Sequence, residues 1–371
     1  MKVLQIYDCD AVNCGIMSVI LEWNRQLVKT DIHFDYLFSY HKEDFYATEI
    51  TKLGGKVFYM EKGNRINNFS QFVKEVKIFM KLHKNEYSIV HLHTTTFSFP
   101  YLYYAKKYNI QIRIAHAHSI AFGNSKFNSI RNRLLIWPIK YLANYFLACS
   151  TLAGQAWFKN RGINNYNIIL NGIDTTKYQY DDEKRKKIRE ELNLNEEDVA
   201  VIHISNMTKI KNVPFVLKTF NQMLKKNKRC VLYLAGRNEL PKNVVQVIEE
   251  YKLVNYVVNL GIRKDISDLL QAMDICLMPS KSEGLGIVAV EAQAAGVPVI
   301  VSKGFPKDVI VTSKIDVIDF DCKIWADVAL EKSKERKNIY DVEKLKKQFD
   351  SSIIAKKMYG FYSKCEKSIY Q

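Results

Sequence analysis

The feature that most constrains the fold is a regular alternation of short apolar runs with amphipathic segments, present in both halves of the sequence. In the first half, runs rich in β-branched and aromatic residues predict strands at 3–7, 33–38, 56–59, 88–91, 111–116 and 145–148. In the second half, similar runs predict strands at 200–204, 230–235, 256–260, 275–278 and 299–301. Short buried strands that alternate with helices are typical of parallel sheets covered on both faces. The sequence therefore predicts an α/β protein with two Rossmann-like, doubly wound parallel-sheet domains.

The length of 371 residues is sufficient for two domains with full hydrophobic cores. We expect an N-terminal domain at residues 1–170, a C-terminal domain at 171–350 and a closing helix at 351–371 that packs back on the N-terminal domain. Residues 171–182 have the weakest pattern and are the expected linker. In doubly wound sheets, ligands bind beyond the carboxyl ends of the strands, so motifs that directly follow strands carry the most weight.

Composition indicates a chain that stays in a reducing compartment. The seven cysteines form an odd set without paired C-x-x-C motifs, which fits the cytoplasm. Asp8 and Asp10 interrupt the first apolar run, so it does not resemble a signal peptide. The most apolar long stretch, 133–150, contains Pro138 and Lys140 and makes a poor transmembrane helix. We therefore expect a cytoplasmic protein.

The net charge of +16 is concentrated in one stretch, because no acidic residue occurs between Glu86 and Asp174. Such a positive field attracts anions, which here include a nucleotide, a phospholipid surface or a phosphorylated acceptor. An ordinary solvated basic surface is the alternative. The pattern of residues 130–146 fits either a helix on an anionic membrane surface or a core helix. Nucleic acid is not an expected partner, since no recognition motif accompanies the charge.

The most informative motif follows the predicted strand 275–278 and leads into a predicted helix at 287–295. Gly284 and Gly286 allow close approach of the backbone to a ligand, and the helix start offers free N–H groups to an anion. Glu283 lies in the loop and Glu291 two turns into the helix, eight positions later. These carboxylates can accept hydrogen bonds from the hydroxyl groups of a sugar and of a ribose, respectively.

This E-x7-E motif and its surroundings resemble those of the family 4 glycosyltransferases, which are retaining enzymes of the GT-B fold. The N-G-I-D run at 171–174 and the L-G-I-R-K-D run at 260–265 match further family segments. The H-L-H run at 91–93 and the A-H-A-H-S run at 115–119 are similar to bacterial capsule and exopolysaccharide members. The resemblance implies two domains facing a cleft, metal-independent catalysis without a cofactor, and a nucleotide-diphosphate sugar, with UDP the expected nucleotide, as substrate.

The resemblance also implies roles for individual residues. Glu283, His118 and Lys211 would form the catalytic group, in which Lys211 neutralises the donor diphosphate and His118 faces the donor from the first domain. Glu291 would hold the ribose. The remaining donor-binding positions implied by the resemblance are Gly15, Asn206, Lys209, Ile262, Arg263, Gly284, Leu285, Gly286 and Ile287. Among these, Gly15 would approach the phosphates, while Ile262 and Arg263 would line the base pocket.

One position departs from the family pattern, because Asn206 stands where the family has an arginine that binds phosphate. The long side chain of Lys209 is the candidate to compensate. The expected activity is transfer of a hexose or N-acetylhexosamine to a glycan or lipid-diphosphate-linked acceptor, at the inner face of the bacterial membrane. Two alternatives remain: a degenerate, non-catalytic partner subunit, and a nucleotide-sugar 2-epimerase. The histidine pairs at 91/93 and 116/118 are expected to line the core or the cleft, with zinc binding as the alternative.

Overall fold

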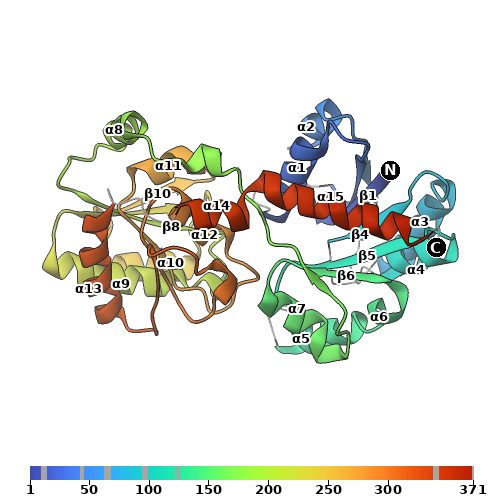
Figure 1. Cartoon of the computed structure of the whole chain (residues 1–371). Helices are drawn as coiled ribbons and strands as arrows, with labels where there is room; N and C mark the ends of the chain where they lie inside the picture. Colours follow the sequence, from blue (N-terminus) through green and yellow to red (C-terminus); the bar gives the residue numbers. More distant parts are fainter. Residues whose placement is uncertain are drawn as a thin grey trace. The chain divides into compact units, whose positions relative to one another are not determined.

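The computed structural model describes residues 1–9, 15–41, 46–61, 68–93, 99–120, 122, 126–336 and 342–369. The chain divides into two compact units: unit 1 comprises Met1–Gly172 together with Ser351–Gln371, and unit 2 comprises Ile173–Asp350. Each unit contains one parallel sheet covered by helices on both faces (Figure 1). The predicted pair of doubly wound α/β domains is thus confirmed.

The described part of unit 1 has a seven-stranded sheet in the order β3-β2-β1-β4-β5-β6-β7, and all neighbouring strands are parallel. The strands are β1 Lys2–Cys9, β2 His33–Tyr40, β3 Val57–Tyr59, β4 Ile89–Leu92, β5 Ile112–Ala117, β6 Tyr145–Ala148 and β7 Asn167–Ile168. The two-residue edge strand β7 was not predicted, because it is too short and too polar to give a pattern.

The helices of unit 1 lie between these strands in the sequence. They are α1 Gly15–Leu27, α2 Ala47–Lys52, α3 Phe69–Leu82, α4 Phe99–Lys107, α5 Lys126–Leu135, α6 Ile139–Leu142 and α7 Thr151–Trp157. The interpretation of residues 130–146 as one helix is wrong, because the structure has the two helices α5 and α6 there. Pro138 cannot donate a helical hydrogen bond, and it stands instead at the N-cap of the short α6.

Unit 2 has six described strands in the order β10-β9-β8-β11-β12-β13, again all parallel. The strands are β8 Val199–Ile204, β9 Cys230–Ala235, β10 Val257–Gly261, β11 Ile275–Met278, β12 Val299–Val301 and β13 Ile315–Val317. The α-helices are α8 Asp182–Glu191, α9 Val213–Lys226, α10 Lys242–Glu250, α11 Ile266–Ala272, α12 Ile287–Ala294, α13 Cys322–Lys332 and α14 Val342–Phe349. The edge strand β13 was not predicted.

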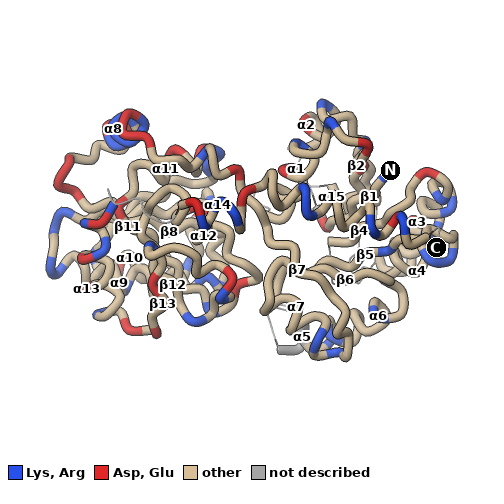
Figure 2. The backbone as a smooth tube through the Cα atoms, in the orientation of Figure 1, with Lys and Arg blue, Asp and Glu red and all other residues tan. Residues whose placement is uncertain are grey.

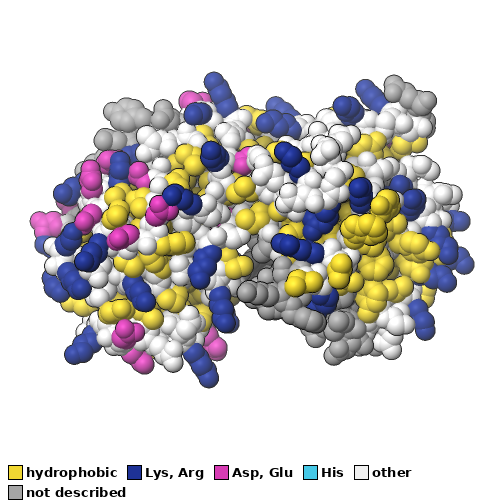
Figure 3. Space-filling model, turned by 90° about the horizontal axis from the view of Figure 1, so that it is seen from below, with side chains coloured by type: hydrophobic (Ala, Val, Ile, Leu, Met, Phe, Trp, Pro, Cys, Tyr) yellow, Lys and Arg dark blue, Asp and Glu magenta, His cyan; other side chains and the backbone are white. Residues whose placement is uncertain are grey.

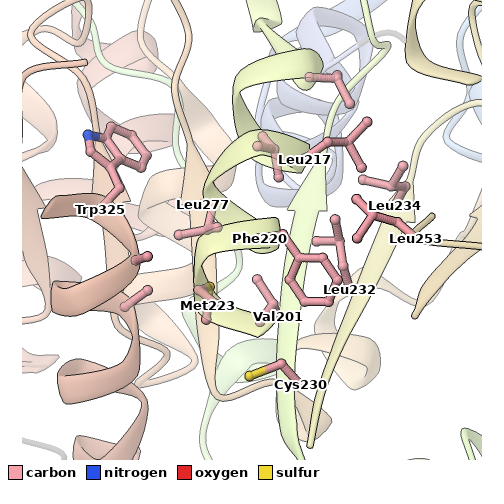
Figure 4. Close-up of a cluster of buried hydrophobic side chains, with 14 of the residues drawn as sticks. Val201, Leu217, Phe220, Met223, Cys230, Leu232, Leu234, Leu253, Leu277 and Trp325 are labelled. Carbon is pink, nitrogen blue, oxygen red and sulfur yellow. The ribbon is translucent and has the colours of Figure 1, made fainter. Parts of the chain in front are cut away.

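The core of unit 2 lies between its sheet and the apolar face of α9. Leu217, Phe220 and Met223 project from α9 onto Val201 of β8 and neighbouring strand residues, and Trp325 of α13 closes one side (Figure 4). All five side chains are fully buried. The rigid sheet that results fixes the positions of the loops beyond its carboxyl edge.

The last helix, α15 (Ser351–Lys367), belongs to unit 1, although unit 2 separates it from the rest of that unit in the sequence. Ser351 Oγ donates a 3.1 Å hydrogen bond to Glu22 Oε1 of α1, and Tyr362 of α15 is fully buried. Helix α15 therefore contributes to the core of unit 1. Among the described residues, no helix is both long and apolar enough to cross a membrane.

Candidate active site

The loops that carry most of the predicted donor-binding residues meet at the carboxyl edge of the unit 2 sheet. The order of the strands reverses between β8 and β11, and a doubly wound sheet binds its ligands at such a point. Lys281 N, after β11, donates a 2.8 Å hydrogen bond to Ile210 O, after β8. At Gly236, after β9, a Cβ would lie 2.4 Å from Ser205 O, so only glycine allows this approach. The three loops therefore form one continuous edge.

The loop at 279–286 is held from two sides, which fixes the position of Glu283. Glu283 N donates a 3.0 Å hydrogen bond to Gly304 O, and the side chain is 7% exposed. Gly286 has φ +84°, and a Cβ there would meet Phe305 at 2.3 Å. Gly286 is also the N-cap of α12. The helix thus begins four residues after Glu283, and within its first turn the Ala289 N–H already donates a 2.9 Å hydrogen bond to Gly286 O.

Lys211 and Glu283 form an ion pair at this edge. Lys211 Nζ donates a 2.7 Å hydrogen bond to Glu283 Oε1. Lys211 is the last residue of the 3-10 turn η4 (Lys209–Lys211), which follows β8, and it is partly buried. Two residues that lie 72 positions apart in the sequence are therefore brought together, as a shared contact with one ligand requires.

Glu291 lies in α12 and is oriented by a residue that the sequence did not indicate. Tyr178 O–H donates a 2.8 Å hydrogen bond to Glu291 Oε1. Burial raises the pKa of the Glu291 carboxyl, and the Tyr178 hydrogen bond partly opposes this shift. Tyr178 ends the 3-10 turn η3 (Thr175–Tyr178), so part of the expected linker 171–182 is ordered structure of unit 2. No local signal in the sequence marks this contact across 113 positions.

The other predicted donor-binding residues of unit 2 lie around this edge. Asn206 and Lys209 are exposed after β8. Ile262 N donates a 3.0 Å hydrogen bond to Asn238 Oδ1, and Arg263 Nε donates a 2.8 Å bond to Asp265 Oδ1. The pairing with Asp265 raises the pKa of Arg263, so its charge is partly neutralised within the unit. Gly284, Leu285 and Ile287 complete the loop and the start of α12.

Arg237 is a further cation at this edge that the sequence analysis missed. Strands β8 and β9 pair with Ile204 opposite Ala235. Two residues further along each strand, Arg237 follows β9 and Asn206 follows β8. Arg237 is exposed, and its guanidinium makes no ion pair or hydrogen bond within the part of the chain that the structure describes. A reading of strand pairing, rather than of motifs, would have found it.

Unit 1 holds the other two predicted residues, Gly15 and His118. Gly15 is the exposed first residue of α1, and a Cβ there would meet nothing within 4 Å, so no steric reason for glycine is found in unit 1 alone. His118 follows β5 and is 8% exposed. Burial lowers the pKa of His118 to about 3, and the neighbouring Asn171 amide opposes this shift. His118 is therefore a neutral imidazole near pH 7.

Four histidines of unit 1 are packed together rather than spread along a surface. The ring centroids of His91, His93 and His116 lie 6.1, 5.9 and 5.9 Å from the ring centroid of Trp23. One nitrogen atom from each of these three histidines lies within 4.8 Å of the other two. Among the described residues, this is the one cluster of three potential metal ligands at such distances. The expectation that the pairs line the core agrees with their burial.

Comparison with known proteins identifies the class that this fold and edge define. A family model described as "Glycosyltransferase Family 4" matches residues 15–177, and one described as "Glycosyl transferases group 1" matches residues 184–328. Together the two models cover most of the chain. The chain belongs to the glycosyltransferases that combine these two domains, and its fold is GT-B.

Individual relatives agree with this family. "Putative glycosyltransferase EpsF" of Bacillus subtilis (strain 168) is 27% identical over 306 residues, which are 81% of this chain and 78% of the relative. "O-antigen biosynthesis glycosyltransferase WclY" of Escherichia coli is 30% identical over 37% of each chain. The crystal structure of Anabaena Alr3699/HepE in complex with UDP and glucose superposes with a TM-score of 0.82 at 18% identity, covering 98% of this chain and 99% of that one.

Proposed function

We propose that this glycosyltransferase moves a hexose or N-acetylhexosamine from a UDP-sugar to a glycan or lipid-linked acceptor during synthesis of a bacterial cell-surface polysaccharide, with retention of configuration. The observation that carries the proposal is the cluster of Lys211, Glu283 and the start of α12 at the point where the strand order reverses. Relatives support the substrate classes: one E. coli relative is named UDP-Gal:alpha-D-GlcNAc-diphosphoundecaprenol alpha-1,3-galactosyltransferase, at 22% identity over 65% of this chain.

In this proposal, each group at the edge binds one part of the donor. Glu291 accepts hydrogen bonds from the ribose hydroxyls, and Glu283 accepts them from the sugar. Lys211 and the first N–H groups of α12 face the diphosphate, because a cation and a helix N-terminus both stabilise negative charge. These fixed charges stabilise the diphosphate as it leaves, without a metal ion.

Retention follows if the acceptor attacks from the side on which the diphosphate departs. The acceptor oxygen bonds to the anomeric carbon while the bond from that carbon to the phosphate oxygen breaks, and the acceptor proton passes to the departing phosphate. The developing charge is then greatest at the diphosphate, which is where Lys211 is placed in this proposal.

Arg237 is our candidate to supply the charge that is missing at Asn206, since the paired strands β8 and β9 bring the two positions to the same edge. We expect Arg237→Ala to weaken UDP binding about 10-fold, and Asn206→Arg to restore most of that loss in the double variant. Isothermal titration calorimetry with UDP measures both. If Arg237→Ala binds UDP as tightly as the wild type does, Arg237 is not part of the proposed site.

A thermal-shift panel with UDP, GDP and ADP and their sugar conjugates, each with and without Mg²⁺, tests the proposed function. At 100-fold excess over its dissociation constant, a ligand stabilises the fold by about 2.7 kcal/mol. We expect a Mg²⁺-independent shift with UDP and a UDP-sugar that disappears in Glu291→Ala. Glu249→Ala is the matched control, because Glu249 is exposed on α10. If no nucleotide changes the melting temperature, the protein is better explained as a non-catalytic partner subunit than as a transferase.

The surface of unit 1 supports a peripheral membrane location. Ile130 and Leu134 of α5, Trp137 between the two helices and Tyr141 of α6 are 63%, 71%, 59% and 56% exposed. Figure 3 shows hydrophobic side chains gathered on unit 1 with Lys and Arg side chains around them, and Figure 2 shows no acidic residue on the tube from β5 to β7. Exposed apolar side chains within a cationic surface favour an anionic lipid bilayer as the occupant.

In this proposal the segment 130–146 has both predicted roles, since Ile136 and Ile139 are buried in the core. Vesicle flotation tests the proposed membrane contact. We expect binding to vesicles with 30% phosphatidylglycerol, little binding to pure phosphatidylcholine, and loss of binding in Leu134→Ser. Leu82→Ser is the control, because Leu82 is 72% exposed on α3 of the same unit. Equal binding to both kinds of vesicle would contradict the proposal.

A further inference from the structure

A buried histidine in the centre of the unit 2 sheet connects two of the strands whose loops form the candidate site. His203 lies in β8 and is fully buried. Its Nδ1 lies 2.7 Å from Leu277 O of the neighbouring strand β11, and its Nε2 lies 2.7 Å from Ser205 Oγ. Met207 N donates a 3.1 Å hydrogen bond to the same Ser205 Oγ. We call these three hydrogen bonds the His203 relay, because they lead from β11 to the turn after β8.

The chemistry of the groups sets the direction of each hydrogen bond in the relay. Leu277 O is a carbonyl oxygen and can only accept, so His203 carries a proton on Nδ1 and donates it. Burial lowers the pKa of His203 to about 4, so the imidazole is neutral near pH 7 and its Nε2 has a lone pair. Ser205 O–H therefore donates to Nε2. The lone pairs of Ser205 Oγ are then available to the Met207 N–H, so each polar atom of the relay has a partner.

The relay holds a turn that the backbone alone does not favour. Met207 has φ +54°, in the left-handed region that residues with a Cβ rarely adopt. The hydrogen bond from Met207 N to Ser205 Oγ encloses Asn206 in a ring of the kind that serine hydroxyls form in turns. On the backbone side, Ser205 N donates a 2.9 Å hydrogen bond to Ala235 O of β9. The residues on both sides of Asn206 are thus fixed by hydrogen bonds.

The fixed turn leads directly to Lys211. Lys211 N donates a 2.9 Å hydrogen bond to Thr208 O, and Thr208 is the next residue after Met207. The backbone conformation at Met207 is therefore transmitted to Lys211, whose ammonium group pairs with Glu283. The loss of one hydroxyl group at the start of the turn would release the backbone that carries this cation.

The position of His203 in the sheet also supports a role beyond packing. The printed backbone register of β8 and β11 pairs Val201 with Ile275 and Ile202 with Cys276, and the His203 side chain binds the next carbonyl of β11. An apolar side chain would fill the core at this point and would avoid the cost of burying two ring nitrogens. The histidine is explained by the serine that it binds, and the serine by the turn that it closes.

We propose that His203 and Ser205 are positioning residues for the diphosphate of the nucleotide sugar. His203 orients the Ser205 hydroxyl group. Ser205 in turn holds the Met207 N–H, so that the turn after β8 presents Lys211 to the phosphates. This inference rests on the proposed function in taking a nucleoside diphosphate as the ligand of the turn. Both residues act through the turn rather than by contact with the ligand, in agreement with their burial.

A comparison of UDP with uridine separates this role from general damage to the fold, because only UDP carries the diphosphate. In titration calorimetry we expect Ser205→Ala to weaken UDP binding about 10-fold and uridine binding by less than 2-fold. Thr219→Val is the matched control, since it removes another buried hydroxyl group of unit 2, from α9, and we expect it to leave both affinities unchanged. Equal losses for UDP and uridine, or an unchanged UDP affinity in Ser205→Ala, would overturn the proposal.

Two substitutions of His203 test whether it acts through Ser205. His203→Gln keeps one donor and one acceptor at the end of the side chain, so we expect UDP affinity close to that of the wild type. His203→Leu removes both and should weaken UDP binding as much as Ser205→Ala does. The double variant should lose no more than either single variant, because the histidine acts only through the serine. If the two losses multiply, His203 acts by another route and the relay is wrong.

Long-range ¹H–¹⁵N correlation spectra of the full chain test the tautomer directly, with His203→Gln for assignment. We expect His203 as the neutral Nδ1–H tautomer at pH 7, with and without UDP. An Nε2–H tautomer or a cationic ring contradicts the direction of the relay. If the wild type binds neither UDP nor uridine, the proposed function fails and this inference fails with it. If the wild type binds UDP and Ser205→Ala binds it equally well, the proposed function stands and only this inference is wrong.

Discussion

The pairing of Lys211 with Glu283 predicts that two substitutions in the same ion pair change nucleotide affinity in opposite directions. Without ligand, Lys211 Nζ is paired with Glu283 Oε1 at 2.7 Å. A diphosphate must therefore compete with this carboxylate for the ammonium group. Glu283→Gln removes the competing charge and leaves the amine available. We therefore expect UDP to bind Glu283→Gln more tightly than the wild type, although transfer of the sugar falls.

The magnitude follows from the hydrogen bond that is released. A hydrogen bond to a charged group contributes about 1.5–3 kcal/mol, and partial exposure of Lys211 places this pair at the lower end, so the gain is about 10-fold in the dissociation constant of UDP. Lys211→Met has the opposite effect. It removes the cation and leaves Glu283 buried without its partner, so UDP affinity falls about 10–100-fold and stability falls by about 1–3 kcal/mol.

Titration calorimetry with UDP, which lacks the sugar that Glu283 would contact, gives the affinities of both variants. Differential scanning fluorimetry gives the stabilities, and about 2–12 °C is the expected loss for Lys211→Met. Glu249→Gln on α10 serves as the charge-matched control for Glu283→Gln. If Glu283→Gln weakens UDP binding as much as Lys211→Met does, the two side chains do not compete in the way we describe.

Four further predictions concern the framework of the site. Asp274 is 5% exposed and pairs with Arg189 at 3.1 Å, so Asp274→Asn leaves a buried guanidinium uncompensated and lowers the free energy of unfolding in urea by about 3–5 kcal/mol. Because burial raises the pKa of Glu291, the folded protein keeps the carboxyl proton to a higher pH than the unfolded chain does. The free energy of unfolding therefore falls as the pH rises from about 4.3, the pKa in the unfolded chain, to the folded pKa. We expect Glu291→Gln to reduce this dependence on pH in melting curves recorded at several pH values. Tyr178→Phe removes the opposing hydrogen bond and raises the Glu291 pKa further in carboxyl ¹³C NMR titration. A Cβ in Gly304→Ala would lie 2.5 Å from Ser280 O, so we expect nucleotide-sugar affinity to fall at least 10-fold while circular dichroism is unchanged.

The architecture was predictable because local patterns of apolar residues mark most of its strands. Each long strand of both sheets is an apolar run of the predicted position and type, since a parallel strand is buried on both faces. The misses are also local in origin. Strand β7 has only two residues, and the three residues of β13 include a central aspartate, so neither gives an apolar run. The helix break at Pro138 was overlooked within an apolar stretch.

Only those residues of the candidate site that belong to a recognisable motif were predictable from the sequence. Glu283 and Glu291 stand in one continuous motif, and Lys211 was found through family resemblance. The partners that orient them come from distant positions: Tyr178 reaches Glu291 across 113 residues, and Lys211 reaches Glu283 across 72. Side-chain contacts at such separations depend on the packed structure and leave no trace in hydropathy or spacing. The roles inferred from the resemblance remain predictions that the experiments above address.

The return of α15 to unit 1 has a consequence for biosynthesis. A ribosome adds about 5–20 residues per second, so roughly 20–70 s pass between the emergence of Gln5 and that of Tyr362, its hydrogen-bonding partner. During this interval the sequence of unit 2 is made without interruption and can complete its fold, while unit 1 still lacks its last helix. The domain that is started first is thus finished last. Nascent chains that stall before residue 351 would carry an incomplete unit 1 with the α1 surface exposed, which makes them the natural clients of chaperones.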